Sequence, residues 1–371
     1  MLNKRFIRSF SLMLIGLGVF FVNSSFPGGS ALGKETRSNL IVNDNLRVIN
    51  EIINYGAMAP SSHNAQMWQV KILSDHELIV MLDPNHTLPQ VDPLNRESMI
   101  SLGCFIENMV EAAPKYNLAA NVRILAQNTA DTEIAAVVFK PKTMDGNWDK
   151  AIENIENRHT LRIPYLKKEL TKPDLNRLKG VSQNSVYFPL NSREGQYLKE
   201  AIIQATKQQV ADDAKQNELA GLMRFSKKEA AANKDGLTPE MMGLSGIAKW
   251  FVTTFFNQNT VLSKSFRKQT VSTVKKQAEN CAGFIIISSP DQSIESLVNS
   301  GRTLEKLLLK ATELKIAVHP LSAPLEESPW QEEIAGAIGI KQEVQMILRV
   351  GYVKDYGKPV SQRRAVTIIQ P

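Results

Sequence analysis

The sequence predicts an α+β fold built from two similar halves in one chain, with an inserted helical segment. Helix-like and strand-like segments are intermixed without a regular βαβ rhythm, which favours α+β over a parallel α/β sheet. Residues 101–112 can be aligned with residues 299–310, and the alignment matches Gly103 with Gly301 and Glu107 with Glu305. With 371 residues, of which 43% are hydrophobic, the chain can bury a substantial core.

The first half is predicted over residues 34–150. Apolar residues at helical spacing predict helices over 46–58 and 96–113. Short apolar and β-branched runs predict strands over 70–73, 77–82 and 134–140.

The second half is predicted over residues 151–371 and contains the segment that matches neither half, about 207–276. Helical spacing from the junction onward predicts helices over 148–157, 173–179, 192–209 and 300–314. Strands are predicted over 282–288 and 344–350, followed by a polar tail. The inserted segment carries Met223, Met241, Met242 and an aromatic run from Trp250 to Phe256, so we expect either a lid over a site or a peripheral helical pair with buried aromatic residues.

The first residues form a separate unit with the layout of a secretory signal peptide. Lys4, Arg5 and Arg8 precede an uncharged apolar run over residues 10–22, and residues 24–33 are small, polar and contain Gly and Pro. The apolar run is shorter than the ~20 residues that span a bilayer, and the basic region has no Arg-Arg pair. We therefore expect residues 1–33 to direct Sec-type export to the periplasm or the exterior, with no stable membrane insertion of the mature chain. An uncleaved signal would instead anchor the protein in the membrane.

Charge and ligand-type residues exclude several classes of function. Removal of residues 1–33 takes away three basic residues and no acidic one, which lowers the net charge from +7 to +4. This mild excess, without Lys/Arg blocks between aromatic residues, indicates no nucleic-acid partner. The five histidines have no metal-binding spacing, so no metal site is expected. Cys104 and Cys281 are expected to be buried free thiols, although export would also permit a disulfide.

The most specific motif covers residues 59–68, which read Ala-Pro-Ser-Ser-His-Asn-Ala-Gln-Met-Trp. Pro60 restricts one φ angle, and Ser61, Ser62, Asn64 and Gln66 supply short hydrogen-bonding groups suited to a planar heterocycle. A helix end followed by an ordinary turn would have a similar composition over any three of these residues. The ten-residue motif resembles the flavin loop of the nitroreductase family, usually Ala-Pro-Ser-Ser-x-Asn-x-Gln-Pro-Trp. Met67 stands where that pattern has its second proline.

The second motif reads Arg158-His159-Thr160-Leu161-Arg162 at the end of a predicted amphipathic helix. Two guanidinium groups and a hydroxyl can converge on a phosphate, whereas basic residues at this spacing also occur on solvated helix faces. The motif resembles the Arg-x-Ser-x-Arg/Lys segment of the same family, which implies that it holds an FMN phosphate.

The order of the two motifs is reversed relative to the family. In homodimers of the family, the phosphate segment of one subunit and the Pro-Ser-Ser loop of the other build one FMN site. Here the first half has only the loop and the second half only the arginines, so the resemblance implies one flavin site at the junction of two fused nitroreductase-like halves. The implied assembly is a monomer with dimer-like architecture or a weak homodimer.

Two later segments follow the family's order. His319-Pro320-Leu321-Ser322 stands where family members bring backbone N–H groups to the flavin. Near the end of the chain, Pro359-Val360-Ser361-Gln362-Arg363-Arg364 resembles the family's tail, whose basic residues reach the phosphate. His319 could also protonate a substrate, or serve a structural role beside the proline. The flavin-binding residues that the resemblance implies are Pro60, Ser61, Ser62, Asn64, Gln66, Arg158, His159, Thr160, Arg162, Pro320, Leu321, Ser322, Arg363 and Arg364.

No Gly-x-Gly-x-x-Gly or Walker sequence occurs in the chain, so neither a dinucleotide fold nor a P-loop is indicated. The resemblance implies an FMN-dependent oxidoreductase that transfers hydride from NAD(P)H or another donor to small nitro- or quinone-type acceptors. The flavin carries this chemistry, so no catalytic side chain is assigned. The alternatives are a flavin-storing protein with little or no turnover and a scaffold that binds no flavin. Export makes another electron donor an open choice, because NAD(P)H is not expected outside the cytoplasm.

Overall fold

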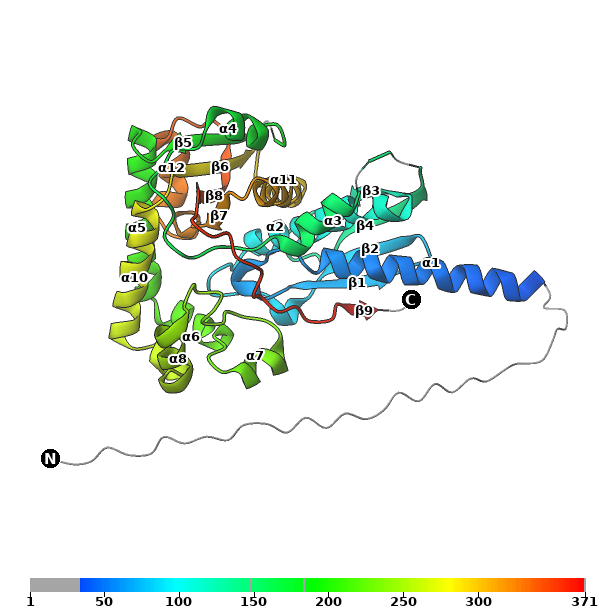
Figure 1. Cartoon of the computed structure of the whole chain (residues 1–371), viewed down its shortest axis with the longest axis horizontal. Coiled ribbons are helices and arrows are strands. Elements are labelled where there is room, and N and C mark those ends of the chain that lie inside the picture. Colours follow the sequence, from blue (N-terminus) through cyan, green and yellow to red (C-terminus); the bar gives the residue numbers. More distant parts are fainter. Residues whose placement is uncertain (1–33, 144, 147, 183, 370–371) are drawn as a thin grey trace, which may run out of the picture. The chain divides into compact units, whose positions relative to one another are not determined.

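The computed structural model describes residues 34–371 except 144, 147, 183, 370 and 371, so the predicted signal segment lies outside the described residues. The chain divides into two compact units, residues 1–41 and 42–371. Helix α1 (Lys34–Gly56) begins in the first unit and ends in the second, and it extends well beyond the helix predicted over 46–58. The remaining elements belong to the second unit (Figure 1).

The second unit contains two antiparallel sheets of corresponding topology. The first half supplies β1 (Trp68–Ile72), β2 (Glu77–Leu82), β3 (Leu118–Ile124) and β4 (Glu133–Pro141), and the second half supplies β5 (Ser185–Pro189), β6 (Gly283–Ser289), β7 (Ala317–Pro320) and β8 (Glu343–Gly351). The strand orders are β3-β4-β2-β1 and β7-β8-β6-β5, and every neighbouring pair among these strands is antiparallel. The two sheets thus have corresponding strand orders, while the predicted boundaries of the two halves stay a prediction.

The first sheet has one additional strand, β9 (Thr367–Ile369), which pairs in parallel with β1. The predicted polar tail is therefore wrong at this point. A three-residue strand is too short to produce a readable alternation, and it forms because the edge of β1 offers unpaired backbone groups. The prediction also missed β3, β5 and β7, of which β5 and β7 are only five and four residues long.

The two halves meet where α2 (Arg96–Ala112) packs against α11 (Ile294–Glu313). A Cβ atom on Gly103 would lie 2.1 Å from the Val298 carbonyl oxygen, and a Cβ atom on Gly301 would lie 2.0 Å from the Ile100 carbonyl oxygen. Only glycine permits so close a backbone approach. The two glycines that the sequence alignment matched are thus the crossing point of the two helices.

The remaining helices cover the sheets or form the inserted segment. They are α3 (Trp148–Asn157), α4 (Lys172–Lys179), α5 (Arg193–Ala211), α6 (Asp213–Leu222), α7 (Lys227–Asn233), α8 (Gly246–Phe255), α9 (Gln258–Val261), α10 (Lys264–Glu279) and α12 (Trp330–Ala337), with short 3-10 turns at Ser62–Asn64, Pro84–His86, Ala113–Tyr116 and Ala323–Leu325. Helices α6 to α10 lie in the inserted segment and have a small apolar cluster of their own, which includes Met223, Phe225 and Met241. Helix α10 returns along α5 to the second sheet (Figure 1).

Three further features bear on the predictions from sequence. Cys104 and Cys281 are both free and buried, in agreement with the expectation of two free thiols. Over the described part of the chain, no helix is long and apolar enough to cross a membrane. Within the same residues, no three His, Cys, Asp or Glu side chains come together as a potential metal site.

Candidate functional site

The loop over residues 60–66 connects α1 to β1 in an irregular conformation. His63, Asn64 and Gln66 have φ angles of 49°, 57° and 58°, in the left-handed region that non-glycine residues seldom adopt. The Ser61 hydroxyl accepts a hydrogen bond from the Gln66 backbone N–H at 3.0 Å, and this bond closes the loop on itself. Three left-handed residues in four positions persist only where surrounding contacts hold them, which is common at binding sites.

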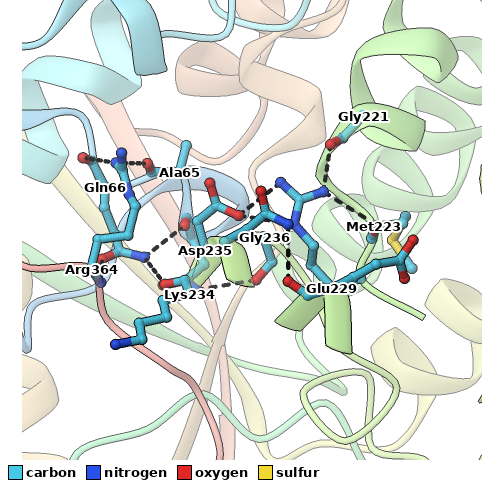
Figure 2. A network of polar contacts seen from close by, with 12 residues as sticks. Ala65, Gln66, Gly221, Met223, Glu229, Lys234, Asp235, Gly236 and Arg364 are labelled. Atoms are coloured by element: carbon cyan, nitrogen blue, oxygen red, sulfur yellow. Dashed lines mark hydrogen bonds and ion pairs between the residues drawn. The ribbon is translucent and has the colours of Figure 1, made fainter. Parts of the chain in front are cut away.

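The inserted segment and the tail hold this loop in place. The buried Gln66 side chain donates to the Lys234 carbonyl oxygen at 2.8 Å and accepts from the Arg364 backbone N–H at 2.8 Å. The Asn64 amide donates to the Gly236 carbonyl oxygen at 3.1 Å. Figure 2 shows Gln66 and Arg364 beside the turn of Lys234, Asp235 and Gly236. These hydrogen bonds therefore join the loop, the inserted segment and the tail, which are far apart in the sequence.

A cavity of about 560 Å³ opens beside this loop, within the size range of small-molecule and cofactor sites. Its lining includes eight of the residues predicted to bind flavin: Pro60, Ser61, Ser62, Thr160, Arg162, Pro320, Leu321 and Ser322. Most of the remaining wall is apolar and comes from the inserted segment, with Met223, Phe225, Leu237, Val252 and Phe256 among its members. One cavity thus brings together residues from the first half, the second half and the insert.

One end of the cavity is electropositive. Arg162 lines it, donates to the Met241 carbonyl oxygen at 3.1 Å and has no carboxylate partner within the part of the chain that the structure describes. Burial, together with the charge of the nearby Arg349, lowers the pKa of Arg162 to about 10. The guanidinium remains charged at neutral pH and is available to an anion in the cavity.

His319 lies at the same end of the cavity and is buried. Its Nδ1 accepts a hydrogen bond from Arg349 at 3.2 Å. Burial lowers the pKa of His319 well below its usual value, and the adjacent Arg349 and Arg162 add to this effect. A neutral imidazole held by an arginine favours the structural role over the proton-donor role considered for His319.

The other six predicted residues lie outside the cavity lining: Asn64, Gln66, Arg158, His159, Arg363 and Arg364. Arg363 donates to the carbonyl oxygens of Met58 and Ala59 at 3.2 and 3.1 Å, and Arg158 also donates to the Met58 carbonyl oxygen. These two arginines thus hold the end of α1 and the start of the loop. Their role as phosphate ligands stays a prediction.

His159 and Arg364 are likewise engaged with the backbone. The ring nitrogens of His159 contact the carbonyl oxygens of Asn157 and Tyr356 at 2.7 and 2.8 Å. Arg364 donates to the carbonyl oxygens of Ala65 and Gln66, both at 2.8 Å. These hydrogen bonds connect Arg364 of the tail to the loop and His159 of the second motif to Tyr356. A role of either residue in ligand binding also stays a prediction.

Two glutamates in the cavity wall were missed by the sequence prediction. Glu97 in the first turn of α2 accepts a hydrogen bond from the Ser62 hydroxyl, and Glu326 accepts one from Gln209 at 2.5 Å. The two carboxyl groups lie within hydrogen-bonding reach of each other. No motif connects residues 97 and 326, so only their proximity in space could reveal the pair.

The two carboxyl groups differ in their protonation. Burial raises the pKa of Glu326 well above its usual value, and the negative charge of Glu97 raises it further. Burial alone would also raise the pKa of Glu97, but Arg96 and the hydrogen bonds from Glu326 and Ser62 outweigh it and lower that pKa. Glu326 is therefore the carboxyl group of the pair that takes up a proton first, because two adjacent buried carboxyl groups cannot both ionise readily.

His63 was also missed, since it occupies the variable position of the first motif. It lines the cavity, and its Nδ1 is buried without a hydrogen-bond partner in the described chain. Burial lowers the pKa of His63, partly offset by the negative charge of Glu97. An unpaired polar atom at a cavity wall is available to a bound ligand.

Comparison with known proteins finds relatives that cover most of the chain. No family model matches the chain. A Mycobacterium tuberculosis protein named as the NAD(P)H nitroreductase acg is 23% identical over 318 residues, which cover 84% of this chain and 91% of that protein. The Serratia protein PigM, named as an NAD(P)H nitroreductase, is 22% identical over 335 residues, 87% of this chain and 93% of its own. The chain is thus similar over most of its length to proteins named as nitroreductases.

Solved structures of nitroreductases resemble the chain less closely. A nitroreductase from Anabaena variabilis has a TM-score of 0.42 at 11% identity, over 75% of this chain and 69% of that one. A nitroreductase from Desulfitobacterium hafniense with bound FMN has a TM-score of 0.34 at 13% identity, over 58% of this chain and 94% of that one.

The first motif departs at Met67 from the loop pattern of the nitroreductase family that it resembles. The Met67 side chain is fully buried in the main apolar core, and its carbonyl oxygen accepts a hydrogen bond from the Asp83 backbone N–H at 3.0 Å. The residue therefore anchors the loop end by packing, in the position where a proline would restrict the backbone.

Proposed function

We propose that this nitroreductase-like chain binds FMN in the 560 Å³ cavity and acts as an oxidoreductase that passes hydride from NAD(P)H or another donor to small nitro- or quinone-type acceptors. The supporting observation is that three segments distant in sequence line one cavity, through residues 60–62, residues 160 and 162, and residues 320–322. Bound FMN would supply the redox chemistry, and the chain would hold and shield it.

The residues of the cavity fit the chemistry of FMN. The Arg162 guanidinium, which has no carboxylate partner among the described residues, suits the phosphate together with Thr160. Ser61, Ser62 and the unpartnered His63 Nδ1 can serve the polar edge of the ring, and the apolar insert wall suits its faces. Glu326 takes up a proton first at the same wall and can provide it to a group that gains negative charge there.

Titration of the protein with FMN tests the binding site. The Arg162→Ala variant loses a charge-assisted contact of roughly 1.5–3 kcal/mol, so its Kd for FMN should rise roughly 10- to 100-fold. Arg193→Ala, at an exposed arginine of α5 outside the cavity lining, is the matched control and should bind like the wild type. Equal affinity in wild type and Arg162→Ala would contradict the assignment of the phosphate end.

An anaerobic absorption spectrum before and after addition of NADPH separates turnover from storage. Bleaching of the flavin band within seconds would support the oxidoreductase with a nicotinamide donor. Bound flavin that stays oxidised with NADPH and is bleached by dithionite would favour storage or another donor. No flavin binding would contradict both.

Export and assembly are also part of the proposal. We expect the mature protein to begin near residue 34 outside the cytoplasm, and N-terminal sequencing of the protein from a fractionated culture checks this. A monomer with two complementary halves should bind one flavin per chain. A dimer with two identical sites would have the same ratio of flavin to chain but twice the molar mass. Light scattering combined with flavin absorbance distinguishes these assemblies.

A further inference from the structure

Helix α8 presents its apolar face to solvent. Ile247, Trp250, Phe251 and Phe255 are 85%, 60%, 49% and 57% exposed, and none of the ten residues of the helix is buried. In α2, by contrast, thirteen residues are buried. Helices of globular proteins normally turn such a stripe toward the core, so the exposed stripe indicates a binding surface.

The exposed side chains form one continuous patch. Their spacing of three and four residues places them on one side of the helix. The Phe255 ring lies 5.0 Å from the Phe251 ring and 5.9 Å from the Trp250 ring, measured between centroids. We call Ile247, Trp250, Phe251 and Phe255 the aromatic patch.

The charge of the surrounding chain indicates the partner. Residues 241–278 contain six basic residues, Lys249, Lys264, Arg267, Lys268, Lys275 and Lys276, and no acidic residue. Lys249, Arg267 and Lys275 pair with Glu240, Asp213 and Glu279. Lys264 and Lys268 are exposed and have no ion pair in the described chain. A cationic segment around exposed Trp and Phe side chains is the composition of an interfacial helix on an anionic lipid surface.

A second copy of the chain fits this surface less well. A two-fold contact would place the same cationic segment against itself and oppose like charges. We therefore propose that the aromatic patch of α8 docks this protein on the surface of an anionic lipid bilayer, without spanning it.

Docking would also place the cavity close to the lipid. Val252 and Phe256 lie on the other side of the α8 segment and line the cavity, and the Phe256 ring packs against Phe225 and Phe266 at 6.0 and 6.4 Å. A helix with its side chains is about 10–12 Å in diameter, so the cavity wall would lie about one helix diameter from the bilayer. Gly243 and Gly246, with φ angles of 81° and 54°, connect α8 to the preceding chain.

Cosedimentation of the full chain with vesicles tests the proposal. Binding is expected to vesicles of phosphatidylcholine with phosphatidylglycerol, and it should be weaker with phosphatidylcholine alone and at high salt. The Trp250→Ser/Phe251→Ser variant should lose at least about tenfold in partition coefficient, since two aromatic side chains would no longer be buried in the bilayer surface. Leu94→Ser, at a leucine that is 71% exposed and far from residue 250 in the sequence, is the control and should bind like the wild type.

The comparison within the full chain separates α8 from other lipid-binding segments. Equal partitioning of the wild type and the double variant would overturn the proposal, because binding would then come from elsewhere, such as residues 1–33. Circular dichroism establishes that the double variant is folded, and Lys264→Gln/Lys268→Gln should weaken binding to anionic vesicles while leaving the aromatic patch intact. Self-association that the double variant abolishes, without vesicle binding by the wild type, would also overturn it and identify a contact between copies.

Discussion

The two halves of the molecule share a strand order and a helix crossing, but they pair their buried glutamates differently. Glu107 and Glu305 each follow the crossing glycine of their helix by four residues, and both are fully buried. Glu107 contacts Arg302 and Lys306 of the opposite helix at 2.7 and 3.2 Å. Glu305 has one ion pair, to Arg158 Nε at 3.5 Å.

This difference shows which part of the duplicated architecture the fold requires and which part is free to specialise. At the crossing of α2 and α11, each helix contributes a glycine, because the two backbones must approach closely. The glutamates are not equivalent. Glu107 connects α2 to α11 through ion pairs with the partly exposed Arg302 and Lys306. Glu305 lies near Arg158 and Arg363, which hold the start of the Pro60–Gln66 loop. The second-half glutamate thus belongs to the surroundings of the candidate site.

The largest effect is expected at the shared crossing. In Gly103→Ala the new methyl group would meet the Val298 carbonyl oxygen at 2.1 Å and Gly301 Cα at 2.9 Å. Backbone atoms cannot rotate away, so we expect the free energy of unfolding to fall by about 3 kcal/mol or more. Chemical denaturation measures it.

Gly221→Ala in α6 is the matched control for this substitution. No atom lies within 4 Å of the new methyl group, and the higher helix propensity of alanine should raise stability by roughly 0.5–1 kcal/mol. Similar losses in the two variants would show that the close crossing is not the cause.

Replacement of Glu305 should change how the free energy of unfolding depends on pH. Burial raises the pKa of Glu305 to about 7, against the opposing charges of Arg158 and Arg363. A raised carboxyl pKa stabilises the folded protein fully below the unfolded value of 4.5, and this contribution is lost as the pH rises through 7. Between these values the wild type should lose up to about 1.4 kcal/mol per pH unit relative to Glu305→Gln, which cannot titrate.

Denaturation of both proteins across this pH range measures the slope, with Glu107→Gln as the control in the other half. A slope that is unchanged in Glu305→Gln would mean that Glu305 titrates normally in the folded protein. The two halves would then share the same electrostatics despite their different ion pairs.

A substitution in the Pro60–Gln66 loop, which only the first half carries, should have a smaller effect on stability. Gln66→Ala removes the hydrogen bonds to the Lys234 carbonyl oxygen and from the Arg364 N–H, both at 2.8 Å. Leaving these buried groups unpaired should cost about 2 kcal/mol. Hydrogen exchange should quicken around residues 234–236 and 364, whereas Gln258→Ala, at an exposed side chain of α9, should leave both segments protected. Unchanged exchange would mean that other contacts hold the insert and tail.

The smallest effect concerns the strand that breaks the symmetry of the sheets. β9 pairs with β1, and β5, the corresponding strand of the second sheet, is an edge strand. A chain that ends at residue 365 lacks β9 and should lose about 1 kcal/mol, since only three residue pairs are removed. Amide exchange should increase in β1 and stay constant in β5; equal changes in both strands would indicate global loosening.

Much of the fold was predictable because it is encoded over short distances. Apolar spacing located α2, α3, α5 and α11, and apolar runs located β1, β2, β4, β6 and β8. The paired glycines predicted the repeat, and the structure uses them at the helix crossing. Short strands such as β7 and β9 were missed, because their conformation depends on a neighbouring strand edge rather than on their own four or three residues.

The candidate site was predictable in part. The sequence identified the segments around Pro60, Thr160 and Pro320, and these meet at the cavity. It did not identify Glu97 and Glu326, which approach each other only after the chain has folded. Arg158 and Arg363 have the residue type of phosphate ligands, yet the structure directs both guanidinium groups to backbone carbonyl oxygens at the start of the loop.

The sequence by itself determined the α+β class and the motifs of the loop, because hydrophobic periodicity, proline and glycine act on neighbouring residues. Only the tertiary structure decided which side chains line the cavity, which carboxyl group takes up a proton first, and that the apolar stripe of α8 faces outward. The reason is that burial and charge interactions depend on distances in space between groups far apart in the chain.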